Sequence, residues 1–385
     1  MLEAVRDGCH GDEEGTLTMG SEQMTGADGT ARPLFSIVMP SYNVAAYIPH
    51  AVDAIRAQEC ADWELIIVDD AATDETGELA ERLAAEDPRI TVVHHPENRW
   101  LSAARNTGMA RARGHYLWIC DPDDDYSPQL LKTCADSLAE APAHIVVFGH
   151  AQRYFGDDGG FLYDNGISPE PGCYRTADEL RRHVLDLEVD TSLGYTWNKV
   201  YDLDFVKSMG IEFEDVRLIE DFTFNLALVG RAESMTVLPD QLYIYAKRAQ
   251  GTLTGAFTAN YYELHRRRIQ SMRDSLDSWG LLDDDARARL GTLYGRYILS
   301  ALERNLDERS GLSGSGRREW LQGVFDDPLF DELMPHAEAE EGSALAICLI
   351  PLKDKRLRGT LRLARLIHFA KDHFYTLFTR LRSQR

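Results

Sequence analysis

Short apolar runs alternate with amphipathic stretches through the first part of this chain. Runs rich in β-branched and aromatic residues occupy 35–39, 65–68, 90–94, 116–120 and 145–148. Between them, helical spacing of apolar residues is found over 45–58, 74–86, 102–113 and 127–140. Near-continuous apolar strands that alternate with amphipathic helices are typical of a mostly parallel sheet covered on both faces. The pattern therefore predicts an α/β fold.

Beyond residue 149 this alternation fades. Residues 150–175 are rich in Gly and Asp, which predicts a loop. The pattern then predicts a helix over 222–229, a short strand over 243–245, and mostly helical chain over 261–333, interrupted by the Ser-Gly repeat at 313–316. The expected regions are a disordered leader over 1–33, an α/β domain over 34–255, a helical region over 256–345 and a basic tail over 346–385. The leader is predicted because its polar composition includes no apolar segment of the signal-peptide kind.

Composition narrows the classes of partner and compartment. The 385 residues carry a net charge of −22, which argues against a nucleic-acid partner because such proteins present a basic face. None of the six cysteines forms a C-x-x-C pair, as is usual for reduced, cytosolic proteins. No apolar stretch reaches the roughly 18 residues that a membrane-spanning helix needs. We therefore expect a cytoplasmic protein.

The tail has the opposite charge to the rest of the chain. Residues 351–385 contain ten Lys and Arg but only two Asp. Apolar residues recur at helical spacing at 363, 366, 367, 370, 374, 377, 378 and 381, flanked by Arg358, Arg362, Arg365, Arg380 and Arg382. A basic amphipathic helix can lie on an anionic membrane, or the same stripe can dock on the acidic body of the protein. We favour the membrane, which predicts a peripheral protein on its inner face.

Polar residues follow three of the predicted strands at the point where each strand ends. The segments are Pro40-Ser41-Tyr42-Asn43, Asp69-Asp70 and Asp121-Pro122-Asp123. In open α/β sheets, ligands bind beyond the carboxyl ends of the strands. The sequence therefore predicts a binding site at one edge of the sheet.

The acidic run at 121–125 is the strongest chemical signal in the chain. Four carboxylates within five residues repel one another, and Mg²⁺ or Mn²⁺ with substrate phosphates would supply the missing positive charge. The alternatives are a cap for the helix that begins near Ser127, or a solvated acidic loop. A calcium loop is excluded because Tyr126 and Lys132 stand where that loop needs Gly and Glu.

Six pieces of the chain, taken in order, form a larger pattern. They are FSIVMPSYNVAAYI, WELIIVDDAATDET, ENRWLSAARNTGMARARGHYLWICDPDDDYSP, YTWNKVY, IEDFTF and LYIYAKRAQGTLT. Together they resemble the family 2 glycosyltransferases from Phe35 to about Thr254. The resemblance implies a GT-A fold, in which a mostly parallel nucleotide-binding sheet is flanked by helices, followed here by a mainly helical C-terminal region. The chain departs from the family at Arg99-Trp100, where Gly-Gly is usual, and this difference implies a reshaped donor pocket.

The resemblance also implies an activity. It is the inverting transfer of a sugar from a nucleotide diphosphate to an acceptor hydroxyl, with Mg²⁺ or Mn²⁺ as cofactor. A glycan or lipid-linked acceptor in cell-envelope or surface polysaccharide synthesis fits a protein at the membrane. The alternative is a degenerate, catalytically weak module that binds nucleotide-sugars at the membrane. A dehydrogenase is disfavoured because the first strand–helix turn lacks G-x-G-x-x-G.

For the donor side, the resemblance implies roles for residues at the sheet edge. Asp123 is the principal expected metal ligand, with Asp121 near the metal or ribose and Asp124 behind them. Asp69 and Asp70 border the nucleotide, where a carboxylate can accept the imide N–H of uracil and so favour a UDP-sugar. The alternative is that one of these two orients the loop before the next helix.

Further donor-side roles fall on four residues. Tyr42 is expected to stack on the base or, alternatively, to pack in the core, while Pro40 and Asn43 shape its turn. Arg105 reaches the diphosphate or forms a salt bridge with the aspartates.

On the acceptor side, Asp221 is the expected general base. The alternatives are an N-cap for the helix at 222–229, or Glu220 as the base. Trp197, Asn198 and Lys199 are expected to form the floor of the acceptor site, with packing in the core as the alternative for Trp197. Arg248 is expected to contact phosphate.

Overall fold

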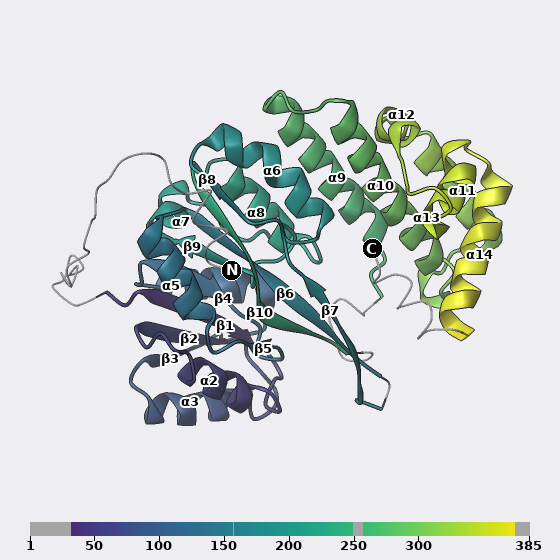
Figure 1. Cartoon of the computed structure of the whole chain (residues 1–385). Coiled ribbons are helices and arrows are strands. Elements are labelled where there is room, and N and C mark those ends of the chain that lie inside the picture. The colour runs from purple at the N-terminus through teal and green to yellow at the C-terminus, as the bar shows by residue number, and fades with distance from the viewer. Residues whose placement is uncertain (1–31, 157, 249–256, 374–385) are drawn as a thin grey trace. The chain divides into compact units, whose positions relative to one another are not determined.

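The computed structural model describes residues 32–156, 158–248 and 257–373, with backbone alone over 370–373 (Figure 1). Contacts divide the chain into two compact units, Met1–Thr252 and Leu253–Arg385. Almost all of the predicted leader lies outside the described residues, as do tail positions 374, 377, 378, 381, Arg380 and Arg382.

The first unit is built on a ten-stranded sheet in the order β3-β2-β1-β4-β9-β6-β10-β5, with β7 beside β6 and β8 beside β10. Its parallel part confirms the predicted strands. These are β1 (Phe35–Ser41), β2 (Trp63–Asp69), β3 (Ile90–His94) and β4 (Tyr116–Ile119). Every residue of β1 and β2 is buried, which explains why both read as continuous apolar runs.

Three helices connect these four strands and a fourth follows them, as predicted. They are α2 (Ile48–Arg56), α3 (Thr76–Glu86), α4 (Trp100–Arg111) and α5 (Leu130–Glu140). Helix α2 buries one face at helical spacing, through Ile48, Ala51, Val52 and Ile55. Figure 1 shows α2 and α3 side by side, with α3 along β2 and β3.

The loop predicted over 150–175 is wrong. Strand β6 (Ile145–Phe155) continues into that region and forms a hairpin with β7 (Phe161–Ile167), and β8 (Gly172–Tyr174) follows. Arg153 opposes Asp164 across the hairpin and donates two hydrogen bonds to it. Half-exposed antiparallel strands tolerate polar residues because only one face needs burial, so the Gly- and Asp-rich composition was misleading.

The sheet becomes mixed beyond β4. Strand β9 (Lys199–Asp202) is antiparallel to both β4 and β6, and β10 (Met235–Lys247) is parallel to β6. The predicted short strand at 243–245 is the end of β10, where it pairs with β5 (Asp125–Tyr126). The remaining helices of this unit are α6 (Ala177–Val189), α7 (Leu203–Met209) and α8 (Glu220–Val229).

The second unit is helical, as predicted for 261–333. Its helices are α9 (Tyr261–Ser278), α10 (Asp284–Arg304), α11 (Gly314–Phe325), α12 (Pro328–Leu333), α13 (Ala344–Lys353) and α14 (Leu357–His373). The Ser-Gly repeat does more than interrupt the helices, since the Ser313 hydroxyl caps α11 by accepting a hydrogen bond from Gly316 N. Among the described residues, no helix is both long and apolar enough to span a bilayer.

Candidate active site

Three parallel strands bring the predicted polar segments to one edge of the sheet. Strand β1 ends at Ser41, β2 at Asp69 and β4 at Ile119, just before the acidic run. Because β1 pairs in parallel with both β2 and β4, their carboxyl ends lie together. The site is therefore positioned by the part of the sheet that the sequence predicted best.

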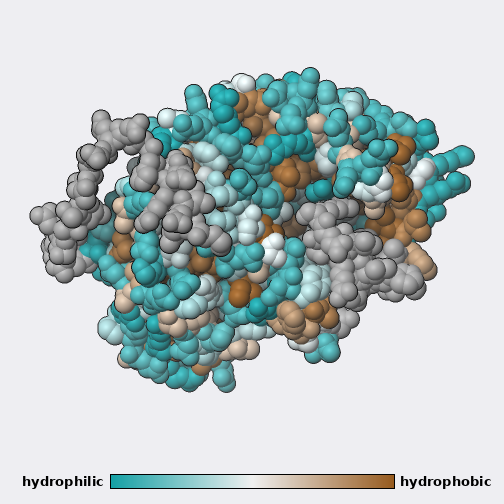
Figure 2. Space-filling model, viewed as in Figure 1, coloured by the Kyte–Doolittle hydropathy of each residue, from teal (hydrophilic) through white to brown (hydrophobic). Residues whose placement is uncertain are grey.

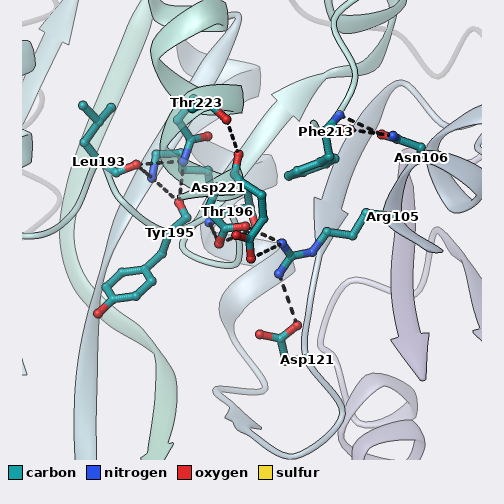
Figure 3. Close-up of polar contacts among 12 residues, drawn as sticks. Arg105, Asn106, Asp121, Leu193, Tyr195, Thr196, Phe213, Asp221 and Thr223 are labelled. Atoms are coloured by element: carbon teal, nitrogen blue, oxygen red, sulfur yellow. Dashed lines mark hydrogen bonds and ion pairs between the residues drawn. The ribbon is translucent and has the colours of Figure 1, made fainter. Parts of the chain in front are cut away.

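Arg105, on helix α4, is the centre of the site. Its guanidinium donates to Asp221 Oδ1 through Nη1, and Nη2 lies 3.6 Å from Asp121 Oδ1 (Figure 3). Nη1 is also 3.9 Å from Glu220 Oε1. The side chain is only 2% exposed. Burial would lower the pKa of Arg105, but the carboxylates of Asp221, Asp121 and Glu220 outweigh it and raise that pKa.

Asp221 lies in the first turn of α8 and is held from two sides. Its Oδ2 accepts hydrogen bonds from the backbone N and the hydroxyl of Thr196, both at 3.2 Å, while Oδ1 meets Arg105. The N-cap position of α8 is Ile219, and no side chain caps it. The carboxylate is therefore committed to the site, and the alternative of a helix cap has no support.

Glu220, the neighbouring acid, lies in a different environment. Burial, together with the charge of Asp221, raises its pKa to about 7. Its Oε2 atom is buried and has no hydrogen-bond partner among the described residues. Glu220 thus lies close to the ion pair of Arg105 and Asp221, but no hydrogen bond to that pair fixes the orientation of its carboxylate.

The carboxylates of the acidic run differ in their surroundings. Burial raises the pKa of Asp121 to about 6, although Arg105 opposes the shift, while Asp123 is 37% exposed and lies 3.3 Å from Arg248 Nη1. Asp124 is buried, with Oδ2 accepting from the Tyr243 hydroxyl at 2.7 Å and Oδ1 from Ala246 N at 2.8 Å. Burial raises the pKa of Asp124 well above its usual value. Asp121 and Asp123 therefore remain for ligands, and Asp124 ties the run to β10.

The described residues contain no group of three or more His, Cys, Asp or Glu side chains arranged to hold a metal. Mg²⁺ is usually held by one or two carboxylates together with substrate phosphates, so a complete protein cage is not needed. The partly exposed carboxylates of Asp121 and Asp123 fit that kind of shared site.

Asp69 and Asp70 have histidine partners that the sequence analysis missed. Asp69 Oδ2 is 2.8 Å from His94 Nδ1, and Asp70 Oδ1 is 2.6 Å from His95 Nδ1. Asp69 Oδ1 also accepts from Ala72 N, as expected for a residue that orients the next loop. His94 and His95 stand at the end of β3, which pairs with β2. Their place in the sequence was the signal that could have predicted these contacts.

The turn after β1 presents a free aromatic face. Tyr42 is 44% exposed, so core packing does not explain it. Asn43 has a left-handed backbone (φ 53°), and its Oδ1 accepts from Thr73 N at 2.8 Å. Pro40 lies within β1 opposite Val68 of β2. The side chain of Tyr42 is therefore accessible, and its stacking on the nucleotide base stays a prediction.

Trp197, Asn198 and Lys199 are buried and present no surface to an acceptor, so their expected role as its floor needs correction. Lys199 Nζ donates to the carbonyls of Ser192 and Tyr195, both at 2.5 Å, and to Asn198 Oδ1. A buried ammonium needs several acceptors, and carbonyls of one loop supply them. These residues hold the loop that presents Thr196 to Asp221.

Comparison with known proteins identifies the class. The model of the family "Glycosyl transferase family 2" matches residues 36–194. Glycosyltransferase GlyG of Streptococcus pneumoniae serotype 4 is 32% identical over 233 residues, which cover 59% of this chain and 75% of GlyG. The chain belongs to the family 2 glycosyltransferases.

Other relatives agree. EpsJ of Bacillus subtilis, an uncharacterized glycosyltransferase, is 33% identical over 216 residues, covering 55% of this chain and 61% of EpsJ. This chain therefore spans about three fifths of that relative. The crystal structure of S. aureus TarS 1–349 with UDP-GlcNAc matches with a TM-score of 0.56 at 19% identity, covering 88% of this chain and 91% of TarS 1–349. That match shows the GT-A fold.

Proposed function

We propose that this protein transfers a sugar from a nucleotide diphosphate, most simply a UDP-sugar, to an acceptor hydroxyl with inversion at the anomeric carbon. One observation carries the proposal: Arg105 joins Asp221, the candidate base, to Asp121 of the acidic run. Asp221 is expected to act on the acceptor and Asp121 on the diphosphate side. The buried guanidinium of Arg105 therefore links the two halves of the proposed site.

In the proposed reaction, Asp221 takes the proton of the acceptor hydroxyl. The hydroxyl oxygen attacks the anomeric carbon, and the bond from that carbon to the diphosphate oxygen breaks, leaving its electron pair on the departing nucleotide. Asp221 suits the first step because Thr196 and Arg105 hold its carboxylate from two sides. A positioned base of this kind contributes roughly 10²–10⁴-fold to the rate.

The donor-side residues would stabilise the charge of the leaving diphosphate. Arg105 is buried and lies 3.6 Å from Asp121, so it would act on the diphosphate through the carboxylate that it holds. Asp123 and Asp121 would hold Mg²⁺ or Mn²⁺, which neutralises diphosphate charge when bound. Arg248, 3.3 Å from Asp123, is a further phosphate contact.

The names of related proteins support the substrate class. TarS has been crystallised with UDP-GlcNAc. TuaG of Bacillus subtilis, 37% identical over 120 residues, is described as a putative teichuronic acid biosynthesis glycosyltransferase. We therefore place the acceptor among cell-surface polysaccharides or their lipid-linked precursors.

Calorimetric titration with UDP, GDP, CDP and dTDP, each with and without Mn²⁺, tests the proposal. We expect UDP to bind in a Mn²⁺-dependent manner. Asp123→Ala should weaken that binding by at least roughly 10–100-fold, the loss that even indirect metal partners cause. Asp125→Ala is the matched control, because Asp125 instead contacts His50 and Arg153. If the folded wild-type protein binds none of these four nucleotides, the proposal that it is an active transferase is wrong.

We further propose that the C-terminal unit contacts an anionic membrane surface. Helix α14 docks within its own unit through buried Thr360 and Ala364, and His368 Nδ1 lies 3.0 Å from Glu303. Leu366 and Phe369 of the predicted stripe nevertheless remain exposed, at 63% and 52%. Figure 2 shows apolar surface over the C-terminal helices. Exposed basic residues accompany it at Arg358, Arg362 and Arg365.

Sedimentation with lipid vesicles measures this contact. Leu366→Asp combined with Phe369→Asp should reduce binding to phosphatidylglycerol vesicles by at least about tenfold, since each buried side chain contributes about 1.5–3 kcal/mol. Neutral phosphatidylcholine vesicles should bind wild type weakly, because they lack the attraction for Arg. Equal binding of wild type and the double variant would exclude this surface.

A further inference from the structure

Trp100 is an unusual residue in an unusual conformation. Its backbone is left-handed (φ 69°), although bulky side chains rarely adopt positive φ, and its side chain is 49% exposed. Strain of this kind persists only where surrounding structure imposes it, and it gathers at functional sites. The departure from the family at Arg99-Trp100 therefore falls on a position where glycine would be relaxed.

The indole is held in place. Arg217 lies over the ring, with its guanidinium carbon 3.8 Å from the ring centroid. Trp100 N donates to Asn98 Oδ1 at 3.1 Å. Leu218, next to Arg217, also has a left-handed backbone (φ 72°). Strained backbone on both sides of the contact thus keeps an exposed ring in one orientation.

The contact between Trp100 and Arg217 belongs to a longer seam of contacts between α4 and the segment 213–221, which ends at Asp221, the candidate general base. Asn106 exchanges two hydrogen bonds with the backbone of Phe213, at 2.9 and 2.8 Å, and Arg105 lies over the Phe213 ring. The buried end of the seam is Arg105 with Asp221 (Figure 3). Trp100 and Arg217 form its exposed end.

On the nucleotide side, Trp100 follows a residue tied to the end of β2. Arg99 N donates to Asp70 Oδ1 at 2.9 Å. Asp70 is one of the two carboxylates expected to border the nucleotide. Trp100 is therefore connected through Arg99 to the nucleotide side of the site. Through Arg217 it is connected to the segment that carries Asp221, the candidate general base. The transferred sugar must lie between these two sides, because its anomeric carbon meets both the diphosphate and the acceptor.

We propose that Trp100 is a stacking platform for the sugar ring of the donor, oriented by Arg217, and that it determines which donor sugar this chain accepts. The proposal rests on the proposed function. An exposed indole offers a large, rigid apolar face to the C–H groups of a pyranose at little entropic cost. A solitary exposed aromatic does not make a protein-binding patch, whereas a ligand pocket needs only one such wall.

The test compares nucleotide with nucleotide-sugar. Wild type and variants are titrated by calorimetry with UDP, UDP-GlcNAc, UDP-glucose and UDP-galactose in Mn²⁺. At least one UDP-sugar should bind wild type more tightly than UDP does. Trp100→Gly, which relieves the left-handed strain, should reduce that advantage roughly three- to tenfold and leave UDP affinity within about twofold. Trp100→Phe should retain part of it, and Arg217→Ala should lose part of it.

The outcomes separate the two proposals. Absence of UDP binding to folded wild type would overturn the proposed UDP-sugar donor and the platform with it, and absence of binding of any nucleotide would overturn the transferase itself. If wild type binds UDP but no UDP-sugar more tightly, or if Trp100→Gly leaves the preference unchanged, only the platform fails. An equal loss for UDP and UDP-sugars in Trp100→Gly would also overturn it, since a merely structural residue gives that result.

Discussion

Replacing Asp221 with Asn should lower the rate of sugar transfer by about 10²–10⁴-fold, the contribution of a positioned general base. The amide cannot accept the proton of the acceptor hydroxyl. UDP affinity should be retained, because Arg105 still has Asp121 and Glu220 within 3.6 and 3.9 Å. The measurement is release of UDP from the UDP-sugar that wild type binds, under saturating Mn²⁺, with UDP titration as the check on folding.

Glu220→Gln is the matched control for that experiment. Glu220 adjoins Asp221, but it has neither the direct hydrogen bond to Arg105 nor the two contacts from Thr196. We expect a much smaller loss of rate than in Asp221→Asn. A larger loss in Glu220→Gln would transfer the role of base to Glu220. The rate should then fall as pH drops below the pKa of about 7 that burial produces there.

Replacing Arg105 with Met should lower the free energy of unfolding by about 3–5 kcal/mol, the usual cost of removing one partner of a buried ion pair. The change leaves the carboxylates of Asp221, Asp121 and Glu220 without their shared cation. Urea unfolding monitored by circular dichroism measures the loss. Arg111→Met is the control, because Arg111 is an exposed residue in the last turn of the same helix.

The loss in Arg105→Met should depend on pH with a definite sign. In wild type, burial already raises the pKa of Glu220, so this group favours the folded state below its unfolded pKa and loses that contribution as pH rises through about 7. Removing the cation raises the pKa further and makes the ionised form costlier to bury. The variant should therefore be destabilised more at pH 8 than at pH 5. A loss no greater than that of Arg111→Met, at both pH values, would contradict the central role of Arg105.

Local patterns were sufficient for much of the fold. The buried parallel strands and the helices between them followed from runs and periodicities within single elements. Antiparallel β7 was missed because a partly exposed strand need not show such a run, and its cross-strand partners lie in β6. The parallel strands also predicted that Asp69, Asp70 and the acidic run would share one edge of the sheet.

What the sequence alone determined is thus the family, the parallel half of the sheet and the residue types gathered at its edge. The tertiary structure decided what each side chain does there. It buried Asp124 against β10, gave Asp69 and Asp70 histidine partners, and placed the ammonium group of Lys199 among loop carbonyls rather than beneath a substrate. The pairing of Arg105 with Asp221 joins positions 116 residues apart. Such contacts depend on how separate elements pack, and no local pattern of polar and apolar residues encodes that.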